Sequence, residues 1–262
     1  MIFHSPRKRL GQHFLHDQQI IQRIIAVITS QPGNHLVEIG PGKGALTFPL
    51  LQQGCQVEVI ELDSTLVQLL QQQTINFEHF YIHHADVLKF DFNHLITTPP
   101  LRICGNLPYN LSTALLFHLL RYANHIQDMT FMLQKEVVER MVAVPGTAEY
   151  GRLSVMLQYY YQMEFLFAVA PQSFYPPPQV DSAVIHLVPY ENPPVTVLNQ
   201  QHFAHLVTQA FSQRRKTLRN SLKGLLDVQE IPASGIDPQR RAETLQLIEF
   251  AQLANQFTLK SK

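Results

Sequence analysis

Apolar residues along the first half of the chain form two alternating patterns. Short, mostly apolar runs recur at residues 36–39, 57–60, 80–83 and 101–104, and such runs are typical of buried strands. Before and between these runs, apolar residues recur every three or four positions, as in residues 20–28, which predicts helices. Strands that alternate with helices at this spacing predict right-handed crossovers. The expected fold class is therefore α/β, with a mostly parallel sheet flanked by helices.

The second half of the chain predicts the end of this sheet and a separate helical part. Apolar runs predict a fifth strand and a closing antiparallel pair at 128–133, 165–169 and 183–188. A polar, proline-bearing stretch at 189–201 then marks a boundary, and the pattern beyond it is helical and rich in Gln, Leu and Ala. We therefore expect two domains, residues 1–195 and a small all-α domain of residues 196–262.

Glycines and acidic residues follow the ends of the first three predicted strands. The Gly40-Pro41-Gly42-Lys43-Gly44 loop follows the first, Glu61 follows the second and Asp86 follows the third. Because ligands of such sheets bind at the carboxyl ends of the strands, these residues are expected to face one crevice. The loop fits methyltransferases and, with Ala45, also the dinucleotide fingerprint G-x-G-x-x-A. Glu61 is spaced to accept ribose hydroxyls, and Asp86 can accept an adenine amino group or cap a loop. An adenosine-containing cofactor of either kind is therefore expected.

The segment Asn106-Leu107-Pro108-Tyr109 follows the fourth predicted strand. The Asn106 side-chain oxygen and the Leu107 carbonyl can both accept from an exocyclic NH2 group, and Pro108 fixes the backbone. The Tyr109 ring can stack on the base that carries this amine. The alternative interpretation is a strand that ends in an ordinary Asn-Pro turn.

Phe174 is a second candidate ring for holding a base. It precedes three successive prolines at 176–178, which make a stiff, extended loop. Together with Tyr109 it could clamp an unstacked base, although for either ring alone core packing is the favoured interpretation. No Tyr-x-x-x-Lys pattern occurs, which argues against a hydride-transfer enzyme.

Charge restricts how the chain could bind nucleic acid. The 20 Lys and Arg residues balance 20 Asp and Glu residues, so no global positive field exists. Two local basic patches remain, and the second is predicted to lie on one helical face opposite an apolar face. The patches comprise Arg7, Lys8 and Arg9, and Arg214, Arg215, Lys216, Arg219 and Lys223. A basic helical face is otherwise simply solvated.

The remaining composition predicts a cytoplasmic protein without a metal site. Cys55 and Cys104 lie in apolar runs and are expected to be reduced core thiols. The thirteen histidines lack a convincing ligand spacing, so no metal is expected. No window approaches the roughly 20 apolar residues that a membrane span needs, and nothing in the sequence demands more than a monomer.

Several motifs together resemble the ribosomal RNA adenine dimethyltransferase family over nearly the whole chain. They are residues 11–15 (GQHFL), 37–42 (VEIGPG), 60–63 (IELD), 106–109 (NLPY), 174–182 (F-x-P-x-P-x-V-x-S) and 214–220 (RRKTLRN). The glycine loop is weakly specific, whereas the last three motifs together are strongly specific. The resemblance implies a Rossmann-like class I methyltransferase domain with a helical RNA-binding domain.

The resemblance also implies an activity and a binding site. S-adenosylmethionine would be the methyl donor, and two adjacent adenosines near the 3′ end of small-subunit (16S) rRNA, within the 30S particle, would each receive two methyl groups on N6 during ribosome biogenesis. The family's cofactor pocket corresponds here to Gln12, His13, Leu15, Gly40, Gly42, Glu61, Asp86, Val87 and Asn106. Residues 106–109 and Phe174 would form the catalytic site. His13 stands where the family often has Asn. The alternatives are a ribosome-assembly or nucleic-acid-binding factor that acts by binding, and a nicotinamide-dependent reductase.

Overall fold

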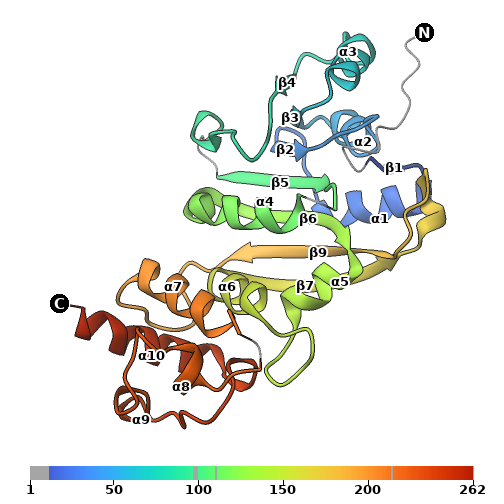
Figure 1. Cartoon of the computed structure of the whole chain (residues 1–262). Helices are drawn as coiled ribbons and strands as arrows, with labels where there is room; N and C mark the ends of the chain where they lie inside the picture. The colour runs from blue at the N-terminus through green and yellow to red at the C-terminus, as the bar shows by residue number, and fades with distance from the viewer. Residues whose placement is uncertain (1–11, 97–99, 110, 214, 262) are drawn as a thin grey trace. The chain divides into compact units, whose positions relative to one another are not determined.

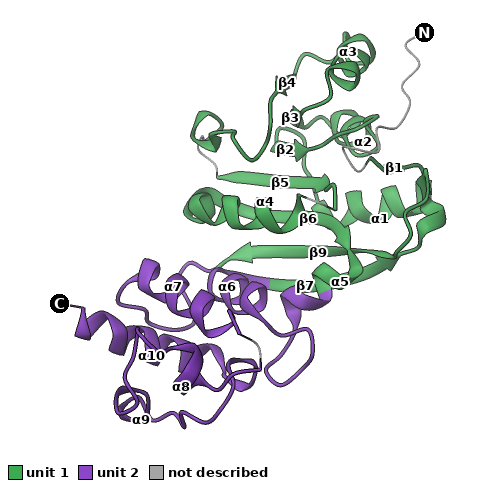
Figure 2. Cartoon of the chain, viewed as in Figure 1, with its two compact units in different colours: residues 1–138, 163–189 green, residues 139–162, 190–262 purple. Residues whose placement is uncertain are grey.

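A computed structural model describes residues 12–96, 100–109, 111–213 and 215–261. The chain divides into two compact units, residues 1–138 with 163–189 and residues 139–162 with 190–262 (Figure 2). These units differ from the predicted domains in residues 139–162 and 190–195, which group with the C-terminal helices. The boundary after residue 195 between two separate domains stays a prediction.

Within the described residues, a seven-stranded sheet forms the centre of the first unit (Figure 1). Its strand order is β4-β3-β2-β5-β6-β9-β7. Neighbours from β4 to β6 are parallel, whereas β9 is antiparallel to β6. The strands are β2 (His35–Ile39), β3 (Gln56–Glu61), β4 (Phe80–His84), β5 (Leu101–Asn106), β6 (Ile126–Gln134), β7 (Tyr161–Val169) and β9 (Ser182–Pro189). The expected mostly parallel α/β sheet is confirmed, and β5 extends through Asn106.

Helices alternate with the strands of this sheet along the chain. They are α1 (Gln18–Ile28), α2 (Thr47–Gln52), α3 (Ser64–Gln73), α4 (Ser112–Leu119) and α5 (Lys135–Val142), with short 3-10 turns η2 (Phe92–His94), η3 (Leu120–His125) and η4 (Pro171–Ser173). The α1 helix begins at Asp17, whose carboxylate accepts hydrogen bonds from the Gln19 and Ile20 backbone. Within the described ranges, none of the helices combines the length and apolar character needed to cross a membrane.

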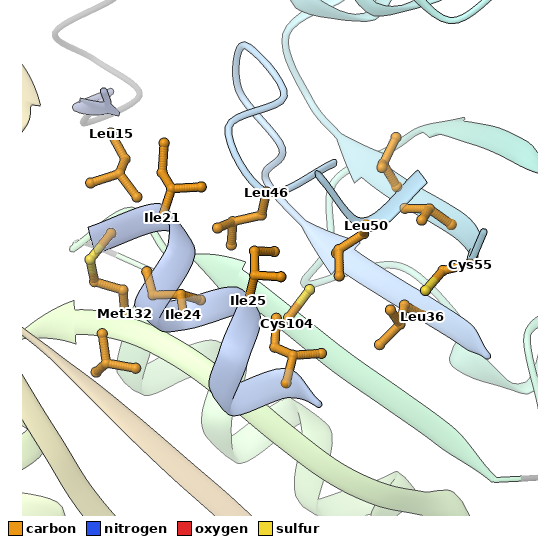
Figure 3. Close-up of a cluster of buried hydrophobic side chains, with 14 of the residues drawn as sticks. Leu15, Ile21, Ile24, Ile25, Leu36, Leu46, Leu50, Cys55, Cys104 and Met132 are labelled. Atoms are coloured by element: carbon orange, nitrogen blue, oxygen red, sulfur yellow. The ribbon is translucent and has the colours of Figure 1, made fainter. Parts of the chain in front are cut away.

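Adjacent strand residues are buried on both faces of the sheet. Leu36 and Val37 of β2 are 1% and 0% exposed, although successive side chains of a strand point to opposite faces. Leu36 belongs to a cluster in which the isoleucines of α1 pack against the sheet (Figure 3). Cys55 and Cys104 lie in the same cluster as buried, free thiols, so their predicted core role is confirmed.

A charged residue, Arg102, lies within the buried β5 strand. It is 8% exposed, and its guanidinium group binds both carboxylate oxygens of Asp128, the residue opposite on β6, at 2.9 and 2.7 Å. It also donates to the Ile28 carbonyl at 2.6 Å. This pairing explains how a predicted apolar strand accommodates a permanent positive charge.

A short antiparallel sheet joins the N-terminal segment to the proline-containing loop. It consists of β1 (Phe14–Leu15) and β8 (Phe174–Tyr175), with Phe14 opposite Tyr175 and Leu15 opposite Phe174. Leu15 and Phe174 are buried, whereas Tyr175 is 63% exposed. The pairing therefore directs one ring of the β8 dipeptide into the core and the other outward.

The second unit is helical in its described residues. It contains α6 (Arg152–Tyr160), α7 (Gln200–Ala210), α8 (Leu218–Ser221), α9 (Glu230–Ala233), η5 (Ala242–Thr244) and α10 (Leu247–Lys260). Phe203 of α7 and Phe250 of α10 are fully buried, and the buried Tyr150 hydroxyl donates to the Leu245 carbonyl at 2.9 Å. The predicted helical character of the C-terminal segment is confirmed.

Candidate functional site

A narrow cavity of about 100 Å³ lies at the carboxyl ends of β2, β3 and β5. The glycine loop forms one side of it, and residues 12–15 and 106–109 form others. Its lining includes Gln12, His13, Phe14, Leu15, Glu38, Gly40, Gly42, Lys43, Leu46, Glu61, Leu62, Leu66, Asn106, Leu107, Pro108 and Tyr109. The structure therefore brings together most of the residues that the sequence placed at strand ends.

The glycine loop needs glycine at the positions that face the cavity. Gly40 and Gly42 have φ values of 65° and 58°, in the left-handed region that side chains disfavour. A Cβ on Gly40 would lie 3.9 Å from the Asn106 carbonyl oxygen and from Pro108, and a Cβ on Gly42 would lie 3.1 Å from the Phe14 ring. The bare backbone leaves space in which a ligand can approach the loop.

Glu61 places a buried carboxylate in the cavity. It is 7% exposed, and its oxygen accepts a hydrogen bond from the Asp63 backbone at 2.8 Å. Burial raises the pKa of Glu61 above its ordinary value, while hydrogen bonds from the Asp63 and Gly42 backbone oppose the rise. Asp63 in turn caps α3 and accepts a hydrogen bond from the Gln12 side chain at 3.0 Å. Gln12 is thereby attached to the strand end that carries Glu61.

Glu38 is a cavity residue that the sequence analysis did not single out. It lies inside β2 and is 1% exposed, and it accepts a hydrogen bond from the Thr47 hydroxyl. Burial raises the pKa of Glu38 to about 7; the Thr47 hydrogen bond opposes this rise, and the neighbouring Glu61 adds to it. Its sequence signals were its position in the strand before the glycine loop and in the motif at residues 37–42, and neither of them shows that its carboxylate is buried.

Asn106 ends β5 with its side chain held in one orientation. Its Nδ2 donates to the His13 backbone carbonyl at 3.0 Å. Oδ1 is therefore the amide atom left to accept a hydrogen bond from a ligand. The Leu107 backbone N–H donates to the Met132 carbonyl at 3.0 Å, which ties the segment to β6. The preceding Gly105 has no room for a side chain, because a Cβ would lie 2.4 Å from the Ile39 carbonyl oxygen.

Tyr109 and His13 form a stacked pair beside Asn106. Their ring centroids are 5.7 Å apart with an interplanar angle of 26°. The Tyr109 hydroxyl forms a 2.7 Å hydrogen bond with the Ser182 hydroxyl, and burial raises the pKa of Tyr109. His13 Nδ1 donates to the Pro176 carbonyl at 2.7 Å, since a carbonyl only accepts. Both rings are thus fixed by hydrogen bonds at their edges.

A second, wider cavity of about 640 Å³ shares three residues with the first. Gln12, His13 and Tyr109 line both. The remaining lining of the second cavity comprises Gln134, Tyr175, Pro176, Pro177, Pro178, Gln179 and Val180. The two cavities therefore adjoin along the stacked His13 and Tyr109 rings.

Phe174 does not take the place that the sequence analysis expected for it. The ring is 2% exposed, belongs to the hydrophobic core cluster and lines neither cavity. The reason is its pairing with Leu15 in the short β1–β8 sheet, which directs both side chains into the core. The ring of this segment that lines a cavity is Tyr175.

Asp86 and Val87 follow β4 but are absent from the described lining of both cavities. Asp86 Oδ1 accepts a hydrogen bond from the Leu88 backbone at 3.0 Å, which is the loop-cap role considered as its alternative. Val87 is 7% exposed. Their cofactor contacts stay a prediction.

The second basic segment is exposed but is not one continuous helix. Arg215, Lys216, Arg219 and Lys223 are exposed, and among the described residues of this segment only those of α8 are helical. Gly224, with a φ of 95°, follows shortly after α8 and has a backbone conformation that a helix cannot continue. Arg7, Lys8, Arg9 and Arg214 lie outside the described residues. Among the described residues, no group of three or more His, Cys, Asp or Glu side chains could hold a metal ion.

A family model and similar sequences identify the family, and two solved structures share the fold. A family model described as ribosomal RNA adenine dimethylase matches residues 3–259. Ribosomal RNA small subunit methyltransferase A of Hydrogenovibrio crunogenus is 52% identical, with 97% of each chain covered, and that of Pseudomonas putida is 53% identical over 97% of this chain and 95% of its own. The fold matches a dimethyladenosine transferase from Plasmodium falciparum with a TM-score of 0.81 and 24% identity, covering 95% of this chain and 98% of that one. It also matches the 23S rRNA methyltransferase ErmE with a TM-score of 0.71 and 24% identity, covering 94% and 99%.

Proposed function

The chain belongs to the ribosomal RNA adenine dimethylase family, and from this premise we propose that it dimethylates N6 of two adjacent adenosines near the 3′ end of 16S rRNA. The methyl donor is S-adenosylmethionine, and the substrate is the 30S ribosomal particle during its biogenesis. The protein acts as a monomer in the cytoplasm, where these particles assemble. The observation that carries this proposal is the fixed amide of Asn106, which lines the first cavity and is held by the backbone of His13, a residue that lines both cavities.

The first cavity has the donor set that S-adenosylmethionine requires. Gly40 and Gly42 leave their backbone open to close approach, and Glu61 offers a carboxylate to ribose hydroxyls. Leu46, Leu62 and Leu66 provide an apolar wall for the adenine ring. When bound, the sulfonium supplies an already activated methyl group, so the protein's task is mainly to align the acceptor.

Asn106 and Leu107 align the acceptor by accepting its N6 hydrogens. The N6 lone pair of adenine is delocalised into the ring and is a poor nucleophile. Hydrogen bonds to Asn106 Oδ1 and to the Leu107 carbonyl favour a pyramidal nitrogen whose lone pair points at the methyl group. Such alignment can contribute about 7–11 kcal/mol through proximity and orientation.

Tyr109 holds the target base next to this amide. Its ring is fixed by the Ser182 hydrogen bond and by stacking on His13, so it is a rigid surface for an unstacked base. Basic side chains contact the RNA phosphates. They are the exposed Arg215, Lys216, Arg219 and Lys223, together with Arg7, Lys8, Arg9 and Arg214. These contacts position the rRNA without reading its sequence.

Replacing Asn106 tests the proposal directly. We expect Asn106→Ala to lose nearly all methyl transfer while it retains most of its affinity for S-adenosylmethionine, because the amide acts on the acceptor. The assay incubates labelled S-adenosylmethionine with 30S particles from cells that lack the modification and quantifies dimethyladenosine in the digested rRNA. Turnover of Asn106→Ala at the wild-type rate would refute the assignment.

The same assay separates this function from that of a factor that acts only by binding. The wild-type protein is expected to convert both adenosines to dimethyladenosine. Binding to the particle without any label transfer would favour the assembly factor. The intact segment from Asn106 to Tyr109 supports catalysis, since a purely binding role does not require a positioned amide at the strand end.

A further inference from the structure

The second cavity is larger than a single target base needs. Its volume of about 640 Å³ lies within the range of about 300–1,000 Å³ for pockets that enclose whole drug-sized ligands. One adenine base against Tyr109, next to Asn106, occupies only the part that adjoins the first cavity. The rest of the cavity, lined by Gln134 and residues 175–180, is left for another group.

The lining of this cavity suits a nucleobase better than a phosphate. None of the described residues that line it is Asp, Glu, Lys or Arg. The polar side chains in its lining are all uncharged amides, phenols and one imidazole, those of Gln12, Gln134, Gln179, Tyr109, Tyr175 and His13. Uncharged amides pair with base edges, whereas phosphates are bound mainly by cations and backbone N–H groups.

Tyr175 gives this cavity a second phenol ring besides that of Tyr109. It is 63% exposed, although its neighbour Phe174 is fully packed in the core. Its backbone is held by pairing with Phe14, and His13 donates to the carbonyl of the next residue, Pro176. An exposed aromatic ring on a fixed backbone is a ready stacking surface for an unstacked base.

Gln134 adds a polar group near this ring. It ends β6 opposite Ser182, the residue that binds the Tyr109 hydroxyl. Within the described chain its side-chain amide has no hydrogen-bond partner, so both its donor and its acceptor are available to a base edge. A glutamine amide can pair with the N6 and N7 atoms of adenine in this way.

We propose that the second cavity holds the nucleotide next to the target adenosine, with its base stacked on Tyr175 and its edge facing Gln134. This inference rests on the proposed function, because it assumes that the target adenosine occupies the Tyr109 side. In a pair of adjacent adenosines, the site holds one while the other is methylated. Tyr175 is therefore a substrate-positioning residue for the tandem substrate.

Steady-state kinetics with unmodified 30S particles test this proposal. We expect Tyr175→Ala to raise the KM for particles by about 5- to 150-fold, the loss that corresponds to removing one base stack. The effect on kcat and on S-adenosylmethionine affinity should be much smaller, and Tyr175→Phe should restore the KM. Tyr81→Ala is the matched control, because Tyr81 is 49% exposed on β4 and is absent from the described lining of both cavities.

A double-mutant cycle identifies the base that Tyr175 contacts. Particles reconstituted with uridine in place of one adenosine offer a smaller stacking surface beside the remaining target. If Tyr175 stacks on that base, the two changes remove the same contact, and their effects on KM are less than additive. Additive effects, or a KM for Tyr175→Ala equal to that of Tyr81→Ala, would overturn the proposal.

Two further measurements keep the result decisive. Loss of S-adenosylmethionine binding by Tyr175→Ala would indicate that this variant does not fold. Tyr175→Leu is then used in its place, since Leu fills space without an aromatic face. The Leu variant should also raise the KM, and an unchanged value would again overturn the proposal. Failure of the wild-type protein to methylate the particles would instead refute the proposed function itself.

Discussion

Glu38 is expected to make the protein less stable as the pH rises. Burial raises the pKa of Glu38 to about 7, whereas the ordinary value is 4.5. Between these two values the folded protein binds more protons than the unfolded chain, so the free energy of unfolding falls as the pH increases. The stabilisation present below pH 4.5 is lost by the time the pH passes about 7. With about 1.4 kcal/mol for each pKa unit, the loss is about 3 kcal/mol.

Glu38→Gln removes this dependence while it preserves the shape of the side chain. Glutamine cannot ionise, and its oxygen can still accept from the Thr47 hydroxyl. Its amide adds a buried donor, which can destabilise the variant by a constant amount. The diagnostic quantity is therefore the change with pH. Between about pH 4.5 and pH 8, the free energy of unfolding of the variant should rise by about 3 kcal/mol relative to that of the wild type.

Urea unfolding of both proteins without cofactor, followed by circular dichroism across this pH range, measures the difference. Glu78→Gln, at an exposed position, controls for the loss of one carboxylate from the chain. A constant stability difference between Glu38→Gln and wild type over this range would refute the reasoning. It would mean that Glu38 does not titrate differently in the folded and unfolded states.

Three further predictions concern two residues of the sheet, Gly105 and Asp128, and the exposed basic residues that we propose bind RNA. Gly105→Ala should lower both the melting temperature and methyl transfer, because the added Cβ would lie 2.4 Å from the Ile39 carbonyl oxygen next to Asn106. Gly151→Ala is the control, since no atom lies within 4 Å of the Cβ it adds. Equal effects of the two substitutions would contradict this account. Asp128→Ala should destabilise the fold by about 3–5 kcal/mol in urea unfolding, since it leaves the Arg102 guanidinium buried and unpaired, and a loss below about 1 kcal/mol would contradict it. Replacing Arg215, Lys216 and Arg219 by Ala should weaken rRNA binding and flatten its salt dependence, whereas a wild-type salt slope would show that these residues face elsewhere.

The position of the first cavity could be predicted from the sequence because parallel topology fixes it. Gly40, Glu61 and Asn106 are far apart in sequence, yet each lies at or just beyond the carboxyl end of a strand in the β3-β2-β5 part of the sheet. Apolar runs were sufficient to find those strands. Asp86 shows the limit of this argument, because its side chain caps the adjacent turn and is absent from the described cavity lining.

The roles of Phe174 and Tyr175 depended on a contact that local pattern does not encode. Pairing between β1 and β8 joins residues far apart in the chain and decides which of two adjacent rings is buried. Burial of Glu38 and the pairing of Arg102 with Asp128 are likewise properties of the assembled sheet. By contrast, the break after α8 had a local signal, Gly224, which a purely periodic interpretation of the basic segment overlooked.

The N-terminal segment links the two cavities into one catalytic arrangement. Gln12 binds Asp63, whose backbone donates to Glu61, so one end of the segment is attached to the first cavity. The His13 carbonyl orients the Asn106 amide, and the His13 ring donates to the Pro176 carbonyl at the second cavity. Asn106 Oδ1 can face an acceptor amine only while this segment holds Nδ2. Under the proposed function, residues 12–13 would therefore help to align methyl donor and acceptor without any of their atoms taking part in the transfer.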